Sequence, residues 1–142
     1  MTQPRLPSAN DPSSWPRLFT LTEANALLPV LVPILEELRE RKATHDETRR
    51  ALARLTPTMR GNGHGAEAAA LERRLAESAA ALAAGLRRVA GYGVEVKDLD
   101  HGLIDFPSPR DGRVVFLCWR LGEGPIAFWH EVDAGFAGRR PL

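Results

Sequence analysis

Side chains capable of chemistry are concentrated in the last third of the chain. His130 ends the apolar run Ile126–His130, and the carboxylates of Asp98 and Asp105 precede it. Burial at the end of an apolar strand disfavours a charged imidazole, and a carboxylate beside it can orient it as a general acid or base. His130 and Asp105 are therefore the candidate catalytic residues. The competing interpretations are a hydrogen-bonded structural histidine and an ordinary ion pair between Asp105 and Lys97.

Arginines in the same region could hold an anionic ligand. Arg110 lies beside a predicted turn, and Arg139 lies near the end of the chain. Guanidinium groups bind carboxylates and phosphates in a forked geometry, so convergence of these two side chains would create an anion site. Solvated arginines without a ligand are the competing interpretation. The candidate ligand-binding residues are Asp98, Arg110, Glu131 and Arg139.

The spacing of possible metal ligands does not predict a metal site. The four histidines show none of the short paired spacings of zinc sites, and a single cysteine cannot form a thiolate cluster. Cys118 lies in the most apolar segment, where burial raises the pKa of a thiol and makes it unreactive. A mixed site of His130 with nearby carboxylates is geometrically possible, but no spacing requires it. Those carboxylates are Asp105, Glu131 and Asp133. We therefore expect no metal and assign no cofactor.

The composition indicates one soluble globular domain. The chain has 142 residues, of which 44% are hydrophobic and 26% charged, and its net charge is +1. Such a small positive charge argues against a dedicated nucleic-acid binder. The most hydrophobic run, Leu27–Leu35, is too short to span a membrane and contains two prolines. With one cysteine and no apolar leader at the N-terminus, a cytoplasmic location is the expectation.

The middle of the chain predicts a long antiparallel helical hairpin over residues 21–90. Thr20 and Glu23 have the spacing of a capping box, which places the start of a helix directly after them. Apolar residues then recur at intervals of three and four, as on the buried stripe of a helix. A proline and several glycines over residues 56–65 predict the hairpin tip, and a second helix follows over about residues 66–90.

Two prolines interrupt the first of these helices. Pro29 and Pro33 each lack the amide that would donate to the carbonyl four residues earlier. The sequence therefore predicts either a kink at Pro29 and Pro33 or a short first helix that ends near Leu28.

Beyond Gly91 the pattern changes from helical to strand-like. Short apolar stretches separated by tight turns predict a four-stranded antiparallel β-meander over residues 94–131, followed by a C-terminal tail over 132–142. Residues 1–17 are rich in Pro, Ser and Asn and predict a disordered tail. The fold prediction is a single α+β domain over residues 18–142, in which the hairpin packs on the sheet.

The predicted sheet has one uniformly apolar face. Pairing of Val96 with Ile104 is the register that produces it, and this register places Lys97 and Asp105 on the opposite face. The segment Arg113–Trp119 is apolar at nearly every position, so both of its faces require cover. The hairpin can cover only one face. We expect either a second copy of the chain or the tail around Phe136 to cover the other.

Sequence segments near both ends of the chain are similar to those of a known family. FTLTEANALLP near the start occurs together with GVEVKDLDHGLIDFP, LCWRLGE and FWHEVDAGFAGRRPL at the end. This combination resembles a family of small, uncharacterised bacterial proteins, known only as a domain of unknown function. The resemblance covers residues 19–142 and implies a bacterial, cytosolic origin. It implies no activity, cofactor or catalytic residue.

Two functions remain open from the sequence. The first is a non-enzymatic binding or interaction module that forms a homo-oligomer or docks a protein partner, because no phosphate loop, nucleophile elbow or dinucleotide fingerprint is present. The second is a small enzyme or ligand-binding protein with an anionic-ligand or metal site at Asp105, Arg110 and His130. The sequence does not decide whether the protein is an enzyme. Nucleic acid and membrane are not expected partners.

Overall fold

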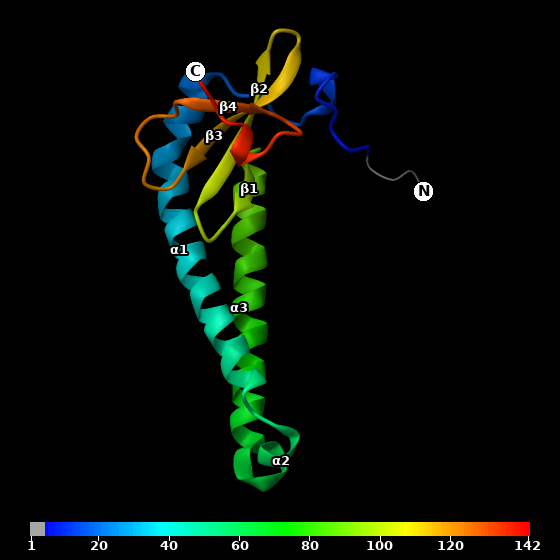
Figure 1. Cartoon of the computed structure of the whole chain (residues 1–142), viewed down its shortest axis with the longest axis vertical. Helices are drawn as coiled ribbons and strands as arrows, with labels where there is room; N and C mark the ends of the chain where they lie inside the picture. Colours follow the sequence, from blue (N-terminus) through cyan, green and yellow to red (C-terminus); the bar gives the residue numbers. More distant parts are fainter. Residues whose placement is uncertain (1–4) are drawn as a thin grey trace.

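The computed structural model describes residues 5–142 and shows an α+β fold, which confirms the predicted class (Figure 1). Two long helices form a hairpin, and an antiparallel sheet packs against one end of it. Within residues 5–142 the sheet has five strands in the order β1-β2-β3-β4-β5. The helices are α1 (Leu21–Ala53), α2 (Pro57–Met59) and α3 (Gly65–Gly91), and the strands are β1 (Glu95–Asp98), β2 (Leu103–Arg110), β3 (Arg113–Arg120), β4 (Phe128–Glu131) and β5 (Arg140–Pro141).

The predicted four-stranded meander is one strand short. β5 falls in the segment that we expected to be a C-terminal tail, and it pairs with β4 through Phe128 and Pro141. A two-residue strand that contains a proline carries almost no alternation in its sequence, so periodicity could not reveal it.

The first long helix begins at its predicted cap but is not broken at its prolines. The Thr20 side chain accepts from the Glu23 amide, and the Glu23 carboxylate accepts from the Thr20 amide, as a capping box requires. α1 then runs without interruption through Pro29 and Pro33, which differs from the predicted kink at these prolines and shows that the short helix ending near Leu28 is wrong. Both prolines lie on the exposed side, where water can replace the missing amide as partner of the freed carbonyls.

The two long helices approach closely near the C-terminal end of α3. Gly85 of α3 lies against Leu38 of α1, and a methyl group at Gly85 would overlap that leucine. Glycine therefore permits the tight packing here. Toward α2 the hairpin extends beyond the sheet (Figure 1), and few of its side chains there are buried. Among the helices of the described residues, none has an apolar stretch long enough to cross a bilayer.

The two faces of the sheet differ in what they carry. The inner face packs on α1 and α3, and the predicted register of Val96 with Ile104 is confirmed. The outer face carries Asp105, Phe116 and His130, because neighbours in register across antiparallel strands point to the same side. The inner-face residues include Val96, Ile104, Phe106, Leu117, Trp119 and Trp129.

The chain's own ends cover the outer face. Residues 5–17, here called the N-terminal strap, pair with the sheet through a hydrogen bond from the Val114 amide to the Ala9 carbonyl at 2.8 Å. Trp15 of the strap places its ring edge-on to Phe116, with centroids 5.6 Å apart. At the other end Arg139 stacks on Phe128.

These contacts differ from the disordered tail that the sequence predicts for residues 1–17. Residues 1–4 of that prediction lie outside the described residues. Residues 5–17 are ordered because Trp15 packs on Phe116. The single large ring of Trp15 supplies the apolar surface that the surrounding Pro, Ser and Asn residues lack, and overall composition does not reveal it. The apolar strand β3 is therefore covered on both faces within one chain, and Phe116 is only 1% exposed.

Candidate functional site

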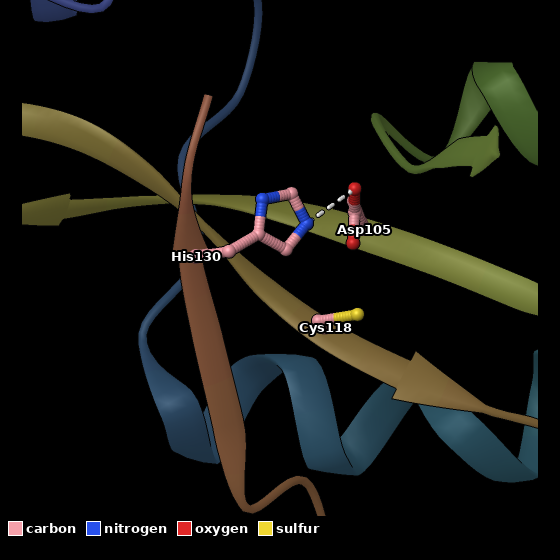
Figure 2. Close-up of side chains that lie close together, drawn as sticks. All are labelled: Asp105, Cys118 and His130. Atoms are coloured by element: carbon pink, nitrogen blue, oxygen red, sulfur yellow. Dashed lines mark hydrogen bonds and ion pairs between the residues drawn. The ribbon is translucent and has the colours of Figure 1, made fainter. Parts of the chain in front are cut away.

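Three chemically capable side chains meet in the outer face of the sheet: Asp105, Cys118 and His130. They come from the adjacent strands β2, β3 and β4 (Figure 2), and Asp105 lies directly opposite Cys118 in the register. Each of the three is at most 1% exposed. In Figure 2 the imidazole points toward the carboxylate and the sulfur lies on the same side of the strands. One ligand atom from each residue lies within 4.8 Å of the others.

Hydrogen bonding fixes the orientation and tautomer of His130. Its Nδ1 lies 2.7 Å from the carbonyl oxygen of Glu131, and its Nε2 lies 2.9 Å from Oδ2 of Asp105. A carbonyl can only accept, so Nδ1 must carry a hydrogen and donate it. In a neutral imidazole Nε2 is then a bare lone pair that faces a carboxylate oxygen. A cation must lie between these two acceptors, either a proton or a metal ion.

Asp105 is incompletely satisfied. Its Oδ2 contacts His130, but its Oδ1 is buried and has no hydrogen-bond partner among residues 5–142. A buried carboxylate oxygen without a partner costs about 1–3 kcal/mol or more. Such an atom calls for an explanation, and an unfilled ligand position on a cation is one.

The environment shifts the pKa values of the two neighbours of Asp105 upward. Burial has the largest single effect on His130, and it lowers the pKa of the imidazole. The hydrogen bonds of the ring to Asp105 and Glu131, together with the charge of Asp105, outweigh burial, so the pKa of His130 is raised. Burial raises the pKa of Cys118 to about 12, and both the charge of Asp105 and the hydrogen-bonding contact of the thiol with that carboxylate add to the rise. Without a metal, Cys118 is therefore a thiol at neutral pH.

The three donors fit a divalent transition metal. Imidazole nitrogen, carboxylate oxygen and thiolate sulfur are the ligands of zinc sites, and two ligands with bonds of about 2.1 Å to a tetrahedral ion lie about 3.4 Å apart. The separation of 2.9 Å between Nε2 and Oδ2 needs only a small adjustment to reach this geometry. The bond from Nδ1 of His130 to a backbone carbonyl is also the usual second contact of a histidine that ligates a metal.

The remaining predicted site residues are placed elsewhere. Asp98 pairs with His101 at the edge of the sheet. Glu131 pairs through its carboxylate with Arg113, and only its backbone contacts His130.

The two arginines do not converge on one anion site. Arg110 stacks on Trp129 of the inner face, whereas Arg139 stacks on Phe128 of the outer face and pairs with Glu123 at 2.8 Å.

Two further alternatives can be compared with the structure. Lys97 does not pair with Asp105, because its ammonium lies over the ring of Phe116 and contacts Glu95 at 3.4 Å. Asp133 is exposed and lies outside the cluster.

The residue that sequence reasoning missed is Cys118. We interpreted it as an inert thiol in an apolar strand, and its raised pKa agrees with that interpretation. Its cross-strand partner was the missing signal. Once Asp105 is assigned to the outer face, the register of β2 with β3 places Cys118 beside it.

Fold and site together define a small α+β protein, a helical hairpin on an antiparallel sheet, with a buried Asp–Cys–His cluster. The chain belongs to DUF2203, a family described as uncharacterized conserved proteins, whose match covers residues 17–142. This confirms the resemblance seen in the sequence. No curated protein matches the chain. No solved structure matches it either.

Proposed function

We propose that this protein binds one divalent transition metal ion through Asp105, Cys118 and His130. The observation that carries the proposal is the buried cluster of three different metal-ligand atoms, in which one carboxylate oxygen has no hydrogen-bond partner within residues 5–142. This retains the mixed metal site of His130 and Asp105 that the sequence left open, with Cys118 in the place of Glu131 or Asp133. Zn²⁺ suits the mixture of nitrogen, oxygen and sulfur donors.

The three residues have distinct tasks in such a site. His130 offers the lone pair of Nε2 because Nδ1 is committed to the Glu131 carbonyl. Cys118 must lose its proton when the ion binds, so affinity rises with pH. Asp105 and the Cys118 thiolate then supply two negative charges, which match a divalent ion. The bound ion supplies a positive charge that ties three strands together.

Burial favours a structural role for the site. The cluster offers three protein ligands, one fewer than closed structural zinc sites have, but all three side chains are nearly inaccessible, whereas a catalytic site must admit substrate. The proposal is therefore a metal-stabilised binding module and not an enzyme.

Cobalt substitution tests the site directly. Protein stripped with EDTA and titrated with Co²⁺ should bind one equivalent and develop a thiolate-to-cobalt charge-transfer absorption. Cys118→Ser should abolish that absorption, and His130→Ala should weaken binding of Co²⁺ by about tenfold or more. His101→Ala is the matched control, because it removes a histidine from an exposed Asp–His pair on the same sheet. A folded wild-type protein that shows no thiolate band would refute the proposal.

Thermal stability provides a second readout that does not depend on spectroscopy. Zn²⁺ should raise the Tm of the stripped wild-type protein, because binding to the folded state alone stabilises it. Cys118→Ser should lose most of this increase. Equal increases in the two proteins would place the ion elsewhere.

A second candidate function is self-association through the outer half of the helical hairpin. The feature that favours it is a seam of half-buried leucines on the part that extends beyond the sheet (Figure 1). Strand β3 offers no open apolar face for a second copy, because the chain's own ends cover it. Light scattering should show a mass above that of one chain at micromolar concentration, and Leu75→Glu should reduce it to one chain. A single-chain mass for the wild type would exclude self-association. The seam consists of Leu52, Leu55, Leu71 and Leu75.

A further inference from the structure

A cavity of about 360 Å³ lies between the N-terminal strap and the rest of the molecule. Trp15 and Pro7 line it from the strap, and Pro107 and Phe116 line it from the outer face of the sheet. These walls are largely apolar. The volume lies at the lower end of the range for small-molecule sites and suits a compact ligand of up to three rings.

We propose that this cavity binds a small organic anion with a flat apolar body. The ring of Trp15 meets Phe116 edge-on at 5.6 Å, so two aromatic side chains from different parts of the chain border the space. Aromatic walls of this kind favour a ring as the occupant, since they pair edge-to-face or offset. Proline side chains add flat apolar surface that needs no hydrogen bond.

Charge around the cavity selects an anion. Its charged lining residues are Arg17, Glu95 and Lys97, which sum to one positive charge. The Lys97 ammonium lies 4.6 Å from the centroid of the Phe116 ring, so it sits at the aromatic wall. Its contact with Glu95 is long, at 3.4 Å, and both side chains are more than a third exposed. Such a pair is weak enough for a carboxylate or sulfonate to compete for the ammonium.

This site is separate from the proposed metal site. Phe116 stands between them, with its ring centroid 5.5 Å from that of His130, and the metal-ligating atoms do not line the cavity. Anion binding should therefore be the same in EDTA-stripped and zinc-loaded protein. The two proposals can fail independently.

Paired fluorescent probes test the proposal on the full chain. 1-Anilinonaphthalene-8-sulfonate is an aromatic anion with a flat apolar naphthalene body, and N-phenyl-1-naphthylamine is its counterpart without the sulfonate. We expect the sulfonate to bind at one site and more tightly than the amine. Lys97→Met should weaken binding of the sulfonate about fivefold and leave the amine unchanged, because only the charged contact is lost. Arg74→Met, which removes an exposed cation from the same chain at a distant point of α3, should leave both unchanged.

A cavity-filling variant tests the location. Ala90 lines the cavity from an exposed position of α3, so a phenylalanine there can occupy the space without disturbing the core. Ala90→Phe should weaken both probes by about tenfold or more. Ala76→Phe, at another exposed position of α3, is the matched control. Unchanged binding in Ala90→Phe would overturn the location, and unchanged sulfonate binding in Lys97→Met would overturn the preference for an anion. Circular dichroism confirms that each variant is folded.

Discussion

The sheet and its β1–β2 turn carry two Asp–His pairs with nearly the same contact distance and very different surroundings. Asp105 and His130 are 2.9 Å apart, and their side chains are 1% and 2% exposed. Asp98 and His101 are 2.7 Å apart, and their side chains are 42% and 60% exposed. A contact distance alone would rank the pairs as equals. Burial is what separates them.

The difference shows what burial demands of a polar group. Water can complete the hydrogen bonding of Asp98 and His101, so their pair is optional for folding. The Asp105 side chain is inaccessible to water, and one of its oxygens has no hydrogen-bond partner among the described residues. The buried pair is costly without a cation, whereas the exposed pair is not. This asymmetry is why the proposed metal site lies at Asp105.

The largest effect of burial should appear in thiol reactivity. In metal-free protein at pH 8, Cys118 should react with iodoacetamide more than about a thousandfold slower than an exposed thiol, because a pKa of about 12 leaves almost no thiolate. The reference is His101→Cys in a Cys118→Ser background, which places a thiol beside Asp98. Denaturant should abolish the difference. Similar rates in the folded proteins would show that the outer face opens readily.

The next largest effect should be a difference in unfolding free energy between variants of His130 and of His101. In the presence of EDTA, His130→Ala should lower the free energy of unfolding by about 3–5 kcal/mol, since it leaves the buried Asp105 carboxylate unpaired. His101→Ala should lower it by at most about 1 kcal/mol, as expected for an exposed pair. Urea denaturation measures both. Equal losses would mean that the buried pair is no more important than the exposed one.

The N-terminal strap should contribute to the free energy of unfolding, because it shields the outer face of the sheet from water. Trp15→Ala removes the ring that packs on Phe116 and should cost about 1–3 kcal/mol in unfolding free energy. Hydrogen exchange of the β3 amides should also become faster. Leu6→Ala, on the same strap but 86% exposed, is the control and should have little effect on either. Equal behaviour of the two variants would contradict a covering role for the strap.

The smallest effect is the pH dependence of the exposed pair. The hydrogen bond from His101 lowers the pKa of Asp98 in the folded protein. A carboxylate whose folded pKa is depressed contributes stability above its unfolded pKa, and that stability is lost as the pH falls through the folded pKa. The stability difference between wild type and Asp98→Asn should therefore shrink between about pH 5 and pH 2, from a value below about 1 kcal/mol. If the stability difference between wild type and Asp98→Asn increased as the pH fell, the pKa of Asp98 would be raised in the folded protein, contrary to the prediction.

Local signals made much of the fold predictable. The capping box at Thr20 and Glu23 set the start of α1, and the pairing of Val96 with Ile104 sorted the first two strands into an apolar and a polar face. Both depend on neighbours in sequence or on a single tight turn. The continuity of α1 through Pro29 and the pairing of β5 were not predictable in this way, because solvent and long-range partners decide them.

The site was predictable only in part. His130 and Asp105 were named from the sequence as chemically capable groups near an apolar strand, and the structure brings them into contact. Cys118 and Trp15 were discounted, since each was judged by the composition of its own segment. Their roles come from what lies across the sheet from them: Asp105 for the cysteine and Phe116 for the tryptophan.

By itself, then, the sequence determined the two long helices, the first four strands and which residues of β1 and β2 share a face, because helix caps, periodicity and turns act over a few residues. Only the tertiary structure decided which polar groups lose their water. That depends on segments far apart in the chain, the strap at one end and Arg139 at the other, closing over the outer face. Burial is a property of the whole assembly of elements, and burial is what makes one Asp–His pair a candidate metal site and leaves the other on the surface.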